Sequence, residues 1–254
     1  MNSIWRIATN TLRQTVRERL FFNILIFGLA MILLSLVVGN LTYGSIFRVV
    51  RSIGLTGVTL AVDLIALLVA VSLVHQEIDR KTLFVVLVRP IARWQYIVGR
   101  YLGLMLAVGS ALAGFSAIYL LAVVIGMGTP SSKDALALLM ILPEASVLGA
   151  FGIMLSSFST PTLSAGVGLG FWIAATAVDD FVRLTADAPD SLKVLARGIY
   201  YALPAFERFD FRQAALYDLP VDATLVFSSA AYGICYALAL VSLAALILSR
   251  REMV

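Results

Sequence analysis

Six long apolar segments constrain the fold of this chain more than any other feature. A helix needs about 20 apolar residues to cross the hydrocarbon core of a bilayer. The segments cover residues 21–39, 55–74, 101–126, 135–158, 161–178 and 224–248. Of the 254 residues 61% are hydrophobic and 13% are charged, whereas about a quarter of the residues of a soluble domain are charged. The sequence therefore predicts an all-α integral membrane protein with six transmembrane helices.

The remaining composition excludes several classes of function. The formal net charge is +4, but the cations lie at the ends of apolar segments rather than on a soluble face, so nucleic acid is not expected as a partner. None of the three lysines follows a glycine, so the chain lacks the Gly-Lys pattern of a phosphate-binding loop. A single histidine and a single cysteine provide no ligand cluster for a metal-dependent intramembrane enzyme.

The distribution of lysine and arginine predicts the orientation of the chain. An even number of spans places both termini on one side of the membrane. Eleven lysines and arginines flank the spans on that side and three lie in the short loops opposite. Because short cytoplasmic segments carry the excess of cations, we expect both termini in the cytoplasm. A cleaved signal peptide is the rival interpretation of residues 1–40, but its apolar core would be too long.

Two segments outside the spans have patterns of their own. Residues 1–20 carry apolar side chains at helical spacing, which predicts an amphipathic helix in the headgroup layer; a solvated, cationic lead-in to the first span is the alternative. Residues 179–222 form the long connection before the last span and predict an external helical subdomain. This subdomain either recognises a substrate or an extracytoplasmic partner, or forms a lid without a recognition role.

A short apolar run lies within the loop over residues 75–100, between the second and third spans. Asp79 can cap a short helix, and Pro90 ends it. This helix would present Leu83, Phe84 and Leu87 beside a rim of cations. An apolar helix on the wet side of a membrane suits insertion into a groove on another protein. The alternative is a helix that only rests in the membrane interface.

The same loop resembles the cytoplasmic loop of the ABC type-2 (ABC-2) transporter permeases. The matching residues, in order, are Glu77, Thr82-Leu83, Arg89-Pro90-Ile91, Arg93, Tyr96 and Gly99-Arg100. The hairpin "FGIMLSSFSTPTLSAGVG" is similar to the same family. The stretch "LPAFERFDFRQAALY" resembles the branch of that family named for multi-copper enzyme maturation.

The resemblance implies a transport subunit rather than an enzyme. It would be the permease of an ATP-driven exporter in the bacterial cytoplasmic membrane, paired with a second copy of itself. Two copies of a separate ATP-binding subunit would hold ATP and Mg²⁺, and this chain would bind no cofactor. The alternative is a transducer that passes ATPase motion to an extracytoplasmic partner without moving a substrate. The residues expected to contact the ATPase are Glu77, Arg80, Thr82, Leu83, Phe84, Leu87, Arg89, Pro90 and Arg93.

Two carboxyl groups lie inside the predicted spans. Asp63 is in the second span and Glu144 in the fourth. A carboxylate at mid-bilayer costs about 2.5 kcal/mol or more, so each should face protein or water. Either they line a substrate path or pair with Arg48 or Arg51, or they make a fixed structural hydrogen bond.

Small residues in the fifth span predict close helix packing. Gly166 and Gly170 form a G-x-x-x-G pair, and Ser164 and Gly168 have the same spacing. Such pairs allow two helices in a membrane to approach closely. The resemblance makes a second copy of the chain one partner for this face, and packing within one subunit is the other.

Overall fold

The protein is a bundle of long helices. The computed structural model describes residues 2–41, 46–73, 93–126, 128–185 and 189–250, and these residues contain no β-strand. The all-α fold predicted from the sequence is therefore confirmed for this part of the chain. The elements are α1 (Asn2–Val16), α2 (Arg19–Leu41), α3 (Ile46–Leu64), the π-helix η1 (Ile65–Val69), α6 (Arg93–Ile125), α7 (Ser132–Ser156), α8 (Pro161–Leu184), α9 (Asp190–Ala202), the 3-10 helix η2 (Phe206–Phe209), α10 (Arg212–Tyr217) and α11 (Ala223–Arg250).

Within the described residues, six helices are long and apolar enough to cross a membrane, which agrees with the predicted number of spans. They cover Arg19–Leu41, Ile46–Leu73, Trp94–Ile125, Ser132–Ser156, Pro161–Leu184 and Ala223–Ser249. The second span begins earlier than the expected residue 55, because the helix continues through Arg48 and Arg51. The apolar pattern of the sequence predicts a loop for these arginines, because charged residues are costly within a span. Arg51 is compatible with a helix because its side chain is buried against a carboxylate.

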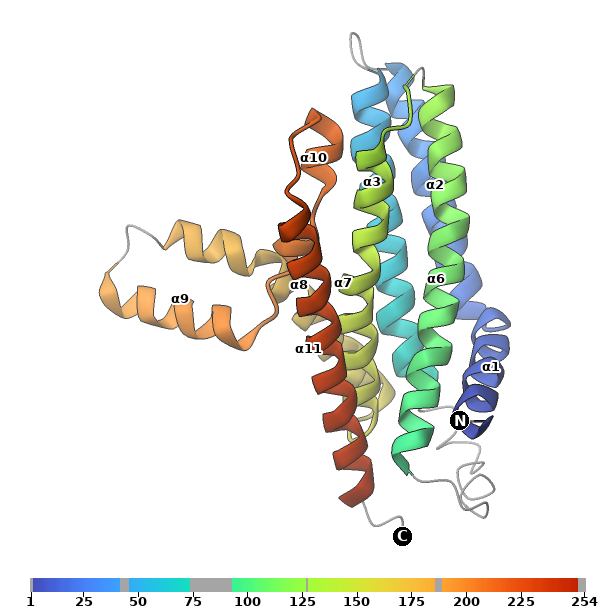
Figure 1. The fold of residues 1–254 in the computed structure, drawn as a ribbon, viewed down its shortest axis with the longest axis vertical. Coiled ribbons are helices and arrows are strands. Elements are labelled where there is room, and N and C mark those ends of the chain that lie inside the picture. The colour runs from blue at the N-terminus through green and yellow to red at the C-terminus, as the bar shows by residue number, and fades with distance from the viewer. Residues whose placement is uncertain (1, 42–45, 74–92, 127, 186–188, 251–254) are drawn as a thin grey trace.

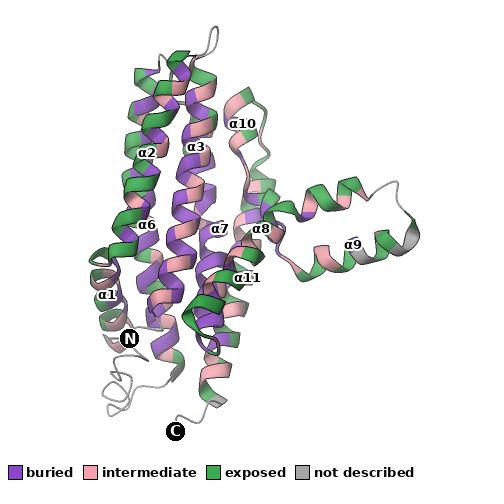
Figure 2. Ribbon diagram, turned by 180° about the vertical axis from the view of Figure 1, so that it is seen from behind, coloured by how far each residue is buried: buried purple, intermediate pink, exposed green. Residues whose placement is uncertain are grey.

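The helices α7 and α3 form the centre of the bundle, and the other spans surround them (Figures 1 and 2). Glycines on α7 allow neighbouring helices to come close: a Cβ atom at Gly152 would lie 2.8 Å from the Cβ of Ala70, and one at Gly149 would lie 3.0 Å from Leu104. The surrounding helices expose large apolar side chains such as Ile26 and Phe227. Exposed apolar surface of this kind is what a lipid environment requires of a membrane bundle.

The helix α1 lies along the beginning of α6 (Figure 1). A Cβ atom at Gly103 would lie 2.5 Å from the carbonyl oxygen of Ala8, so the absence of a side chain allows α1 to approach. Ala8 and Thr11 are buried in this contact, and Trp5 on the same helix is 61% exposed. A helix over Asn2–Val16 therefore lies within the segment 1–20 predicted as amphipathic, and it packs one face on α6. Its contact with lipid stays a prediction.

The segment predicted as an external subdomain, 179–222, divides into two parts. The end of α8 and α9 form an arm that projects to one side of the bundle (Figures 1 and 2). The elements η2 and α10 instead fold back and pack against α3, α7 and α8. Phe206 and Phe209 are each 2% exposed, so this second part belongs to the core of the bundle rather than to a separate unit.

Candidate functional site

The structure brings the carboxyl groups of Asp63 and Glu144 together in the centre of the bundle. Asp63 lies on α3 and Glu144 on α7, and they are 1% and 7% exposed. The two carboxyl groups are close enough for their charges to act on each other. An ionised carboxylate has only acceptors, and two negative charges at this separation repel each other strongly. A proton or another positive group near the pair would relieve this repulsion.

Trp172 on α8 is the third member of this site. Its indole Nε1 donates a hydrogen bond to Oδ2 of Asp63 at 3.3 Å. The other oxygen, Oδ1, is buried and has no hydrogen-bond donor among the described residues. The π-helix η1 begins two residues after Asp63, and π-helical turns inside α-helices are frequent at functional sites. The local helix geometry therefore marks the same place as the paired carboxyl groups.

The arginine whose charge acts on this pair of carboxyl groups is Arg212. It is neither of the arginines proposed from the sequence. The charge of Arg212 acts on both Asp63 and Glu144. Arg51 instead bonds to a carboxylate near the start of α7, and Arg48 is exposed beside the ring of Phe47. The suggested pairing with Arg48 or Arg51 is therefore wrong, because the segment that contains Arg212 folds back into the bundle.

Arg212 is itself held by Asp210. The Nε and Nη2 atoms of Arg212 donate to the two carboxylate oxygens of Asp210 at 2.8 and 2.7 Å, and its backbone N–H donates to the same carboxylate at 3.0 Å. Burial would raise the pKa of Asp210, but the hydrogen bonds and charge of Arg212 outweigh it and hold that pKa below its usual value. The same hydrogen bonds raise the pKa of Arg212. The two groups thus form a charged pair.

A cavity of about 310 Å³ opens beside Glu144. Its walls come from α3, α7, α8 and the segment 206–213. Small-molecule sites in proteins are commonly concave and have about this volume or more. The charged residues that line the cavity are Glu144, Asp180, Arg183, Glu207, Asp210 and Arg212.

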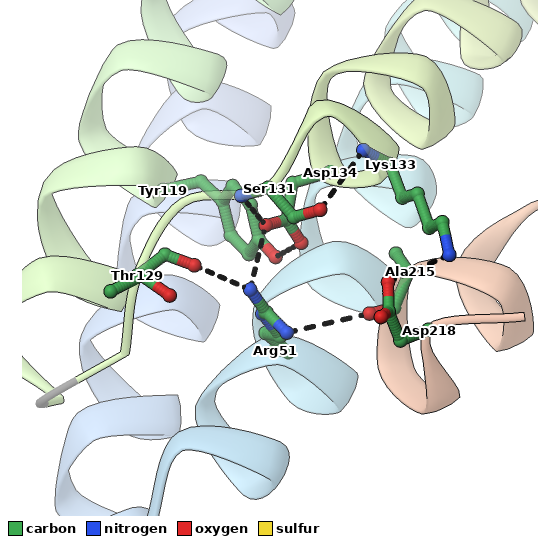
Figure 3. A network of polar contacts seen from close by, with 8 residues as sticks. All are labelled: Arg51, Tyr119, Thr129, Ser131, Lys133, Asp134, Ala215 and Asp218. Carbon is green, nitrogen blue, oxygen red and sulfur yellow. Dashed lines mark hydrogen bonds and ion pairs between the residues drawn. The ribbon is translucent and has the colours of Figure 1, made fainter.

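A second polar network lies at the end of the bundle where α3 and α7 begin (Figure 3). Arg51 and Asp134 are 8% and 0% exposed, and Nη2 of Arg51 donates to Oδ2 of Asp134 at 3.0 Å. The same nitrogen donates to the carbonyl oxygen of Thr129 at 2.6 Å, and the hydroxyl of Tyr119 donates to Oδ1 of Asp134 at 3.1 Å. The backbone N–H of Ser131 completes the capping box of α7. Asp134 therefore neutralises a buried arginine and caps a helix at once.

The same network reaches the segment before the last span. Nη1 of Arg51 donates to the carbonyl oxygen of Ala215 at 3.5 Å. Lys133 forms an ion pair with Asp218 at 2.7 Å, at the end of α10. These contacts fasten α10 to the beginnings of α3 and α7. The apolar pattern alone does not reveal this network, because the fourth apolar segment begins at residue 135, one residue after Asp134.

The small residues of α8 do not all have the same environment. A Cβ atom at Gly168 would lie 2.7 Å from Cδ1 of Leu67 on η1, and Ser164 is 0% exposed. At Gly166 and Gly170 the other described elements place no atom within 4 Å of such a Cβ. Ser164 and Gly168 therefore serve packing within the subunit, while the pair Gly166 and Gly170 faces away from the other described residues.

Most of the predicted coupling residues lie outside the described part of the chain. They are Glu77, Arg80, Thr82, Leu83, Phe84, Leu87, Arg89 and Pro90. Arg93 is the first residue of α6. The second span ends, and α6 begins, at the end of the bundle where α1 lies (Figure 1). The helix α11 also ends there. The roles assigned to these residues stay predictions.

Known proteins resemble this chain over most of its length. A sequence model of the family described as ABC-2 family transporter protein matches residues 5–253. A protein described as "Probable ABC transporter permease protein NosY", from Stutzerimonas stutzeri, is 30% identical over 211 residues, which cover 78% of this chain and 73% of that protein. The match to this relative confirms the resemblance of residues 203–217 to the copper-enzyme maturation branch of the family. The chain is therefore a multi-pass membrane protein that belongs to the ABC-2 family of ABC transporter permeases.

Proposed function

We propose that this chain is the permease subunit of a homodimeric ABC exporter in the bacterial cytoplasmic membrane, with both termini in the cytoplasm. Two copies of a separate ATP-binding subunit bind ATP and Mg²⁺ and dock on the loop over residues 75–100. The observation that carries the proposal is the family match over residues 5–253. The excess of lysine and arginine around this loop and the two termini supports the orientation.

The structure supports a mechanical role for the beginning of α6, which directly follows the loop. Arg100 on α6 is 2% exposed, and its guanidinium donates to Oε1 of Gln14 on α1 at 3.0 Å. Its Nε also donates to the hydroxyl of Tyr96 at 3.3 Å. A force on the loop would therefore move α6 and α1 together, because buried hydrogen bonds to a charged group are strong.

The face of α8 that carries Gly166 and Gly170 supports the second copy of the chain as a partner. This face has open space beside it, and glycine pairs of this spacing bring membrane helices into close contact. A helix from the second subunit packed here would lie on the side of α8 opposite Ser164 and Gly168, which contact the core. The dimer seam would thus lie one helix away from Asp63.

The projecting arm favours a second function. Leu184, Val194 and Tyr201 on this arm are 82%, 70% and 85% exposed. Apolar and aromatic side chains exposed together mark a contact surface. An extracytoplasmic partner that binds the arm would receive motion from α8, so transduction to such a partner without transport is the alternative function.

Reconstituted vesicles test the proposal. Purified alone, the chain is expected to hydrolyse no ATP, and with its ATP-binding subunit the complex is expected to hydrolyse ATP and accumulate substrate in inside-out vesicles. ATP hydrolysis by the chain alone would contradict the proposal. ATP-dependent motion of the arm without accumulation of any substrate would establish the transducer instead.

A further inference from the structure

The charges that line the cavity beside Glu144 do not balance. The lining contains four carboxylates and two arginines: Glu144, Asp180, Glu207, Asp210, Arg183 and Arg212. Arg183 forms an ion pair with Glu207, and Arg212 forms one with Asp210. Neither Glu144 nor Asp180 forms an ion pair with another described residue. The cavity therefore has an excess of negative charge, and it attracts cations.

The deepest part of the cavity is short of hydrogen-bond donors. Glu144 lines the cavity and is 7% exposed. Asp63, on which the charge of Glu144 acts, is 1% exposed and has one oxygen that receives no hydrogen bond from the described residues. Buried polar groups in native proteins are nearly always satisfied. Two neighbouring carboxylates have only acceptors, so they are satisfied by a species that brings donors or positive charge. The site is built for such a species.

We propose that this cavity binds a small organic cation, whose ammonium or guanidinium group is held by Glu144 and Asp63 in exchange for a proton. In the free protein the proton lies between the two carboxyl groups. When the cation binds, its N–H groups donate to the carboxylates, and the proton leaves to the water of the cavity. Charge is conserved, because one positive charge enters the site as one leaves.

An organic cation fits the cavity better than a metal ion. No group of three or more His, Cys, Asp or Glu residues with metal-ligand geometry occurs among the described residues. The volume of about 310 Å³ is that of a small-molecule site. Three aromatic residues, Phe206, Phe209 and Phe211, are also among the lining residues, and aromatic faces attract ammonium and guanidinium groups.

Charged and polar groups of four neighbouring elements set the proton affinity of the pair. Asp63 comes from α3 and Glu144 from α7, and the indole of Trp172 faces them from α8. Arg212 and Asp210 face them from the segment before the last span. That the bound cation is the transported substrate rests on the permease function proposed above. The binding step itself does not depend on that function.

Trp172 provides a direct reporter of this site. The chain contains three tryptophans, and Trp5 and Trp94 are 61% and 53% exposed, so both can be replaced by phenylalanine. In lipid nanodiscs without any ATPase, n-butylammonium is expected to change the fluorescence of Trp172 in a saturable manner and to release protons into a weakly buffered solution. The neutral 1-butanol and the anion butyrate, which have similar size, are expected to do neither.

Variants connect this signal to the proposed groups. Glu144→Gln is expected to weaken butylammonium binding on the order of tenfold or more, because a hydrogen bond to a charged group is lost, and to abolish proton release. Thr176→Leu, on the exposed side of α8, fills the cavity without touching the carboxyl pair and is expected to block binding. Asp222→Asn removes an exposed carboxylate that does not line the cavity and serves as the matched control.

The proposal is overturned by any of three results. The first is an equal response to 1-butanol or butyrate. The second is undiminished binding by the folded Glu144→Gln and Thr176→Leu variants, and the third is saturable binding without proton release. None of these results bears on the permease function, because no ATPase is present in the experiment.

Discussion

The buried ion pair between Arg51 and Asp134 offers a quantitative test of the fold. Asp134 accepts hydrogen bonds from Arg51 at 3.0 Å and from Tyr119 at 3.1 Å, and it is 0% exposed. Replacing Asp134 by alanine leaves the guanidinium of Arg51 buried without its counter-charge. Removal of one partner of a buried pair costs about 3–5 kcal/mol.

This cost translates into a large change in melting temperature. For a protein of about this size, each kcal/mol lowers the Tm by roughly 2–4 °C, so Asp134→Ala is expected to lower it by roughly 6–20 °C. Thermal unfolding of the detergent-solubilised protein, followed by circular dichroism, measures the change. Lys133→Ala is the control. It breaks a neighbouring ion pair whose other member, Asp218, is 83% exposed, and it should change the Tm little.

The double variant Arg51→Met, Asp134→Leu separates the lost counter-charge from other effects of the substitution. A hydrophobic pair of similar volume often replaces a buried ion pair with no loss of stability. We therefore expect the double variant to recover most of the Tm lost by Asp134→Ala. A Tm of Asp134→Ala close to that of the wild type would refute the reasoning, and so would a double variant that is no more stable than Asp134→Ala.

Three further outcomes follow from the fold. Gly168→Ala should lower the Tm because its methyl group would meet a side chain of η1, whereas Gly166→Ala should leave the Tm unchanged and weaken only the dimer, as seen by light scattering. In a background without the native cysteine, Ser131→Cys should react with an impermeant thiol reagent from outside and Met253→Cys only from inside. The pKa of Asp210 is lowered in the folded protein, so the Tm difference between wild type and Asp210→Asn should be complete above pH of about 4 and vanish as the pH falls further.

The sequence predicted the spans well, because the hydrophobic effect depends on local composition. Six apolar segments were sufficient to identify six helices. The boundaries of the spans were harder to predict where a helix contains charged residues. Arg51 appeared to belong to a loop, because its partner Asp134 lies far away in the sequence and no local pattern connects them.

The candidate site depends on contacts that no single segment contains. Asp63 and Glu144 each stood out as a costly carboxyl group within a span, but their closeness in space depends on how α3 packs against α7. Arg212 was missed because residues 203–217 appeared to be a surface connection. Three buried phenylalanines in that stretch, at 206, 209 and 211, were the signal that it folds into the bundle.

The central claim is that a separate ATP-binding subunit drives this permease through residues 75–100, and Phe84→Asp tests it most directly. Phe84 is predicted to insert into a groove on the ATPase, where an unpaired charge commonly costs about 2 kcal/mol or more. The measurement is co-purification of the ATPase with the permease from membranes. We expect Phe84→Asp to insert normally but to lose the ATPase, while Arg80→Ala at the rim retains most of it and Glu77→Ala retains binding but lowers ATPase stimulation. Undiminished recovery of the ATPase with Phe84→Asp would contradict the account.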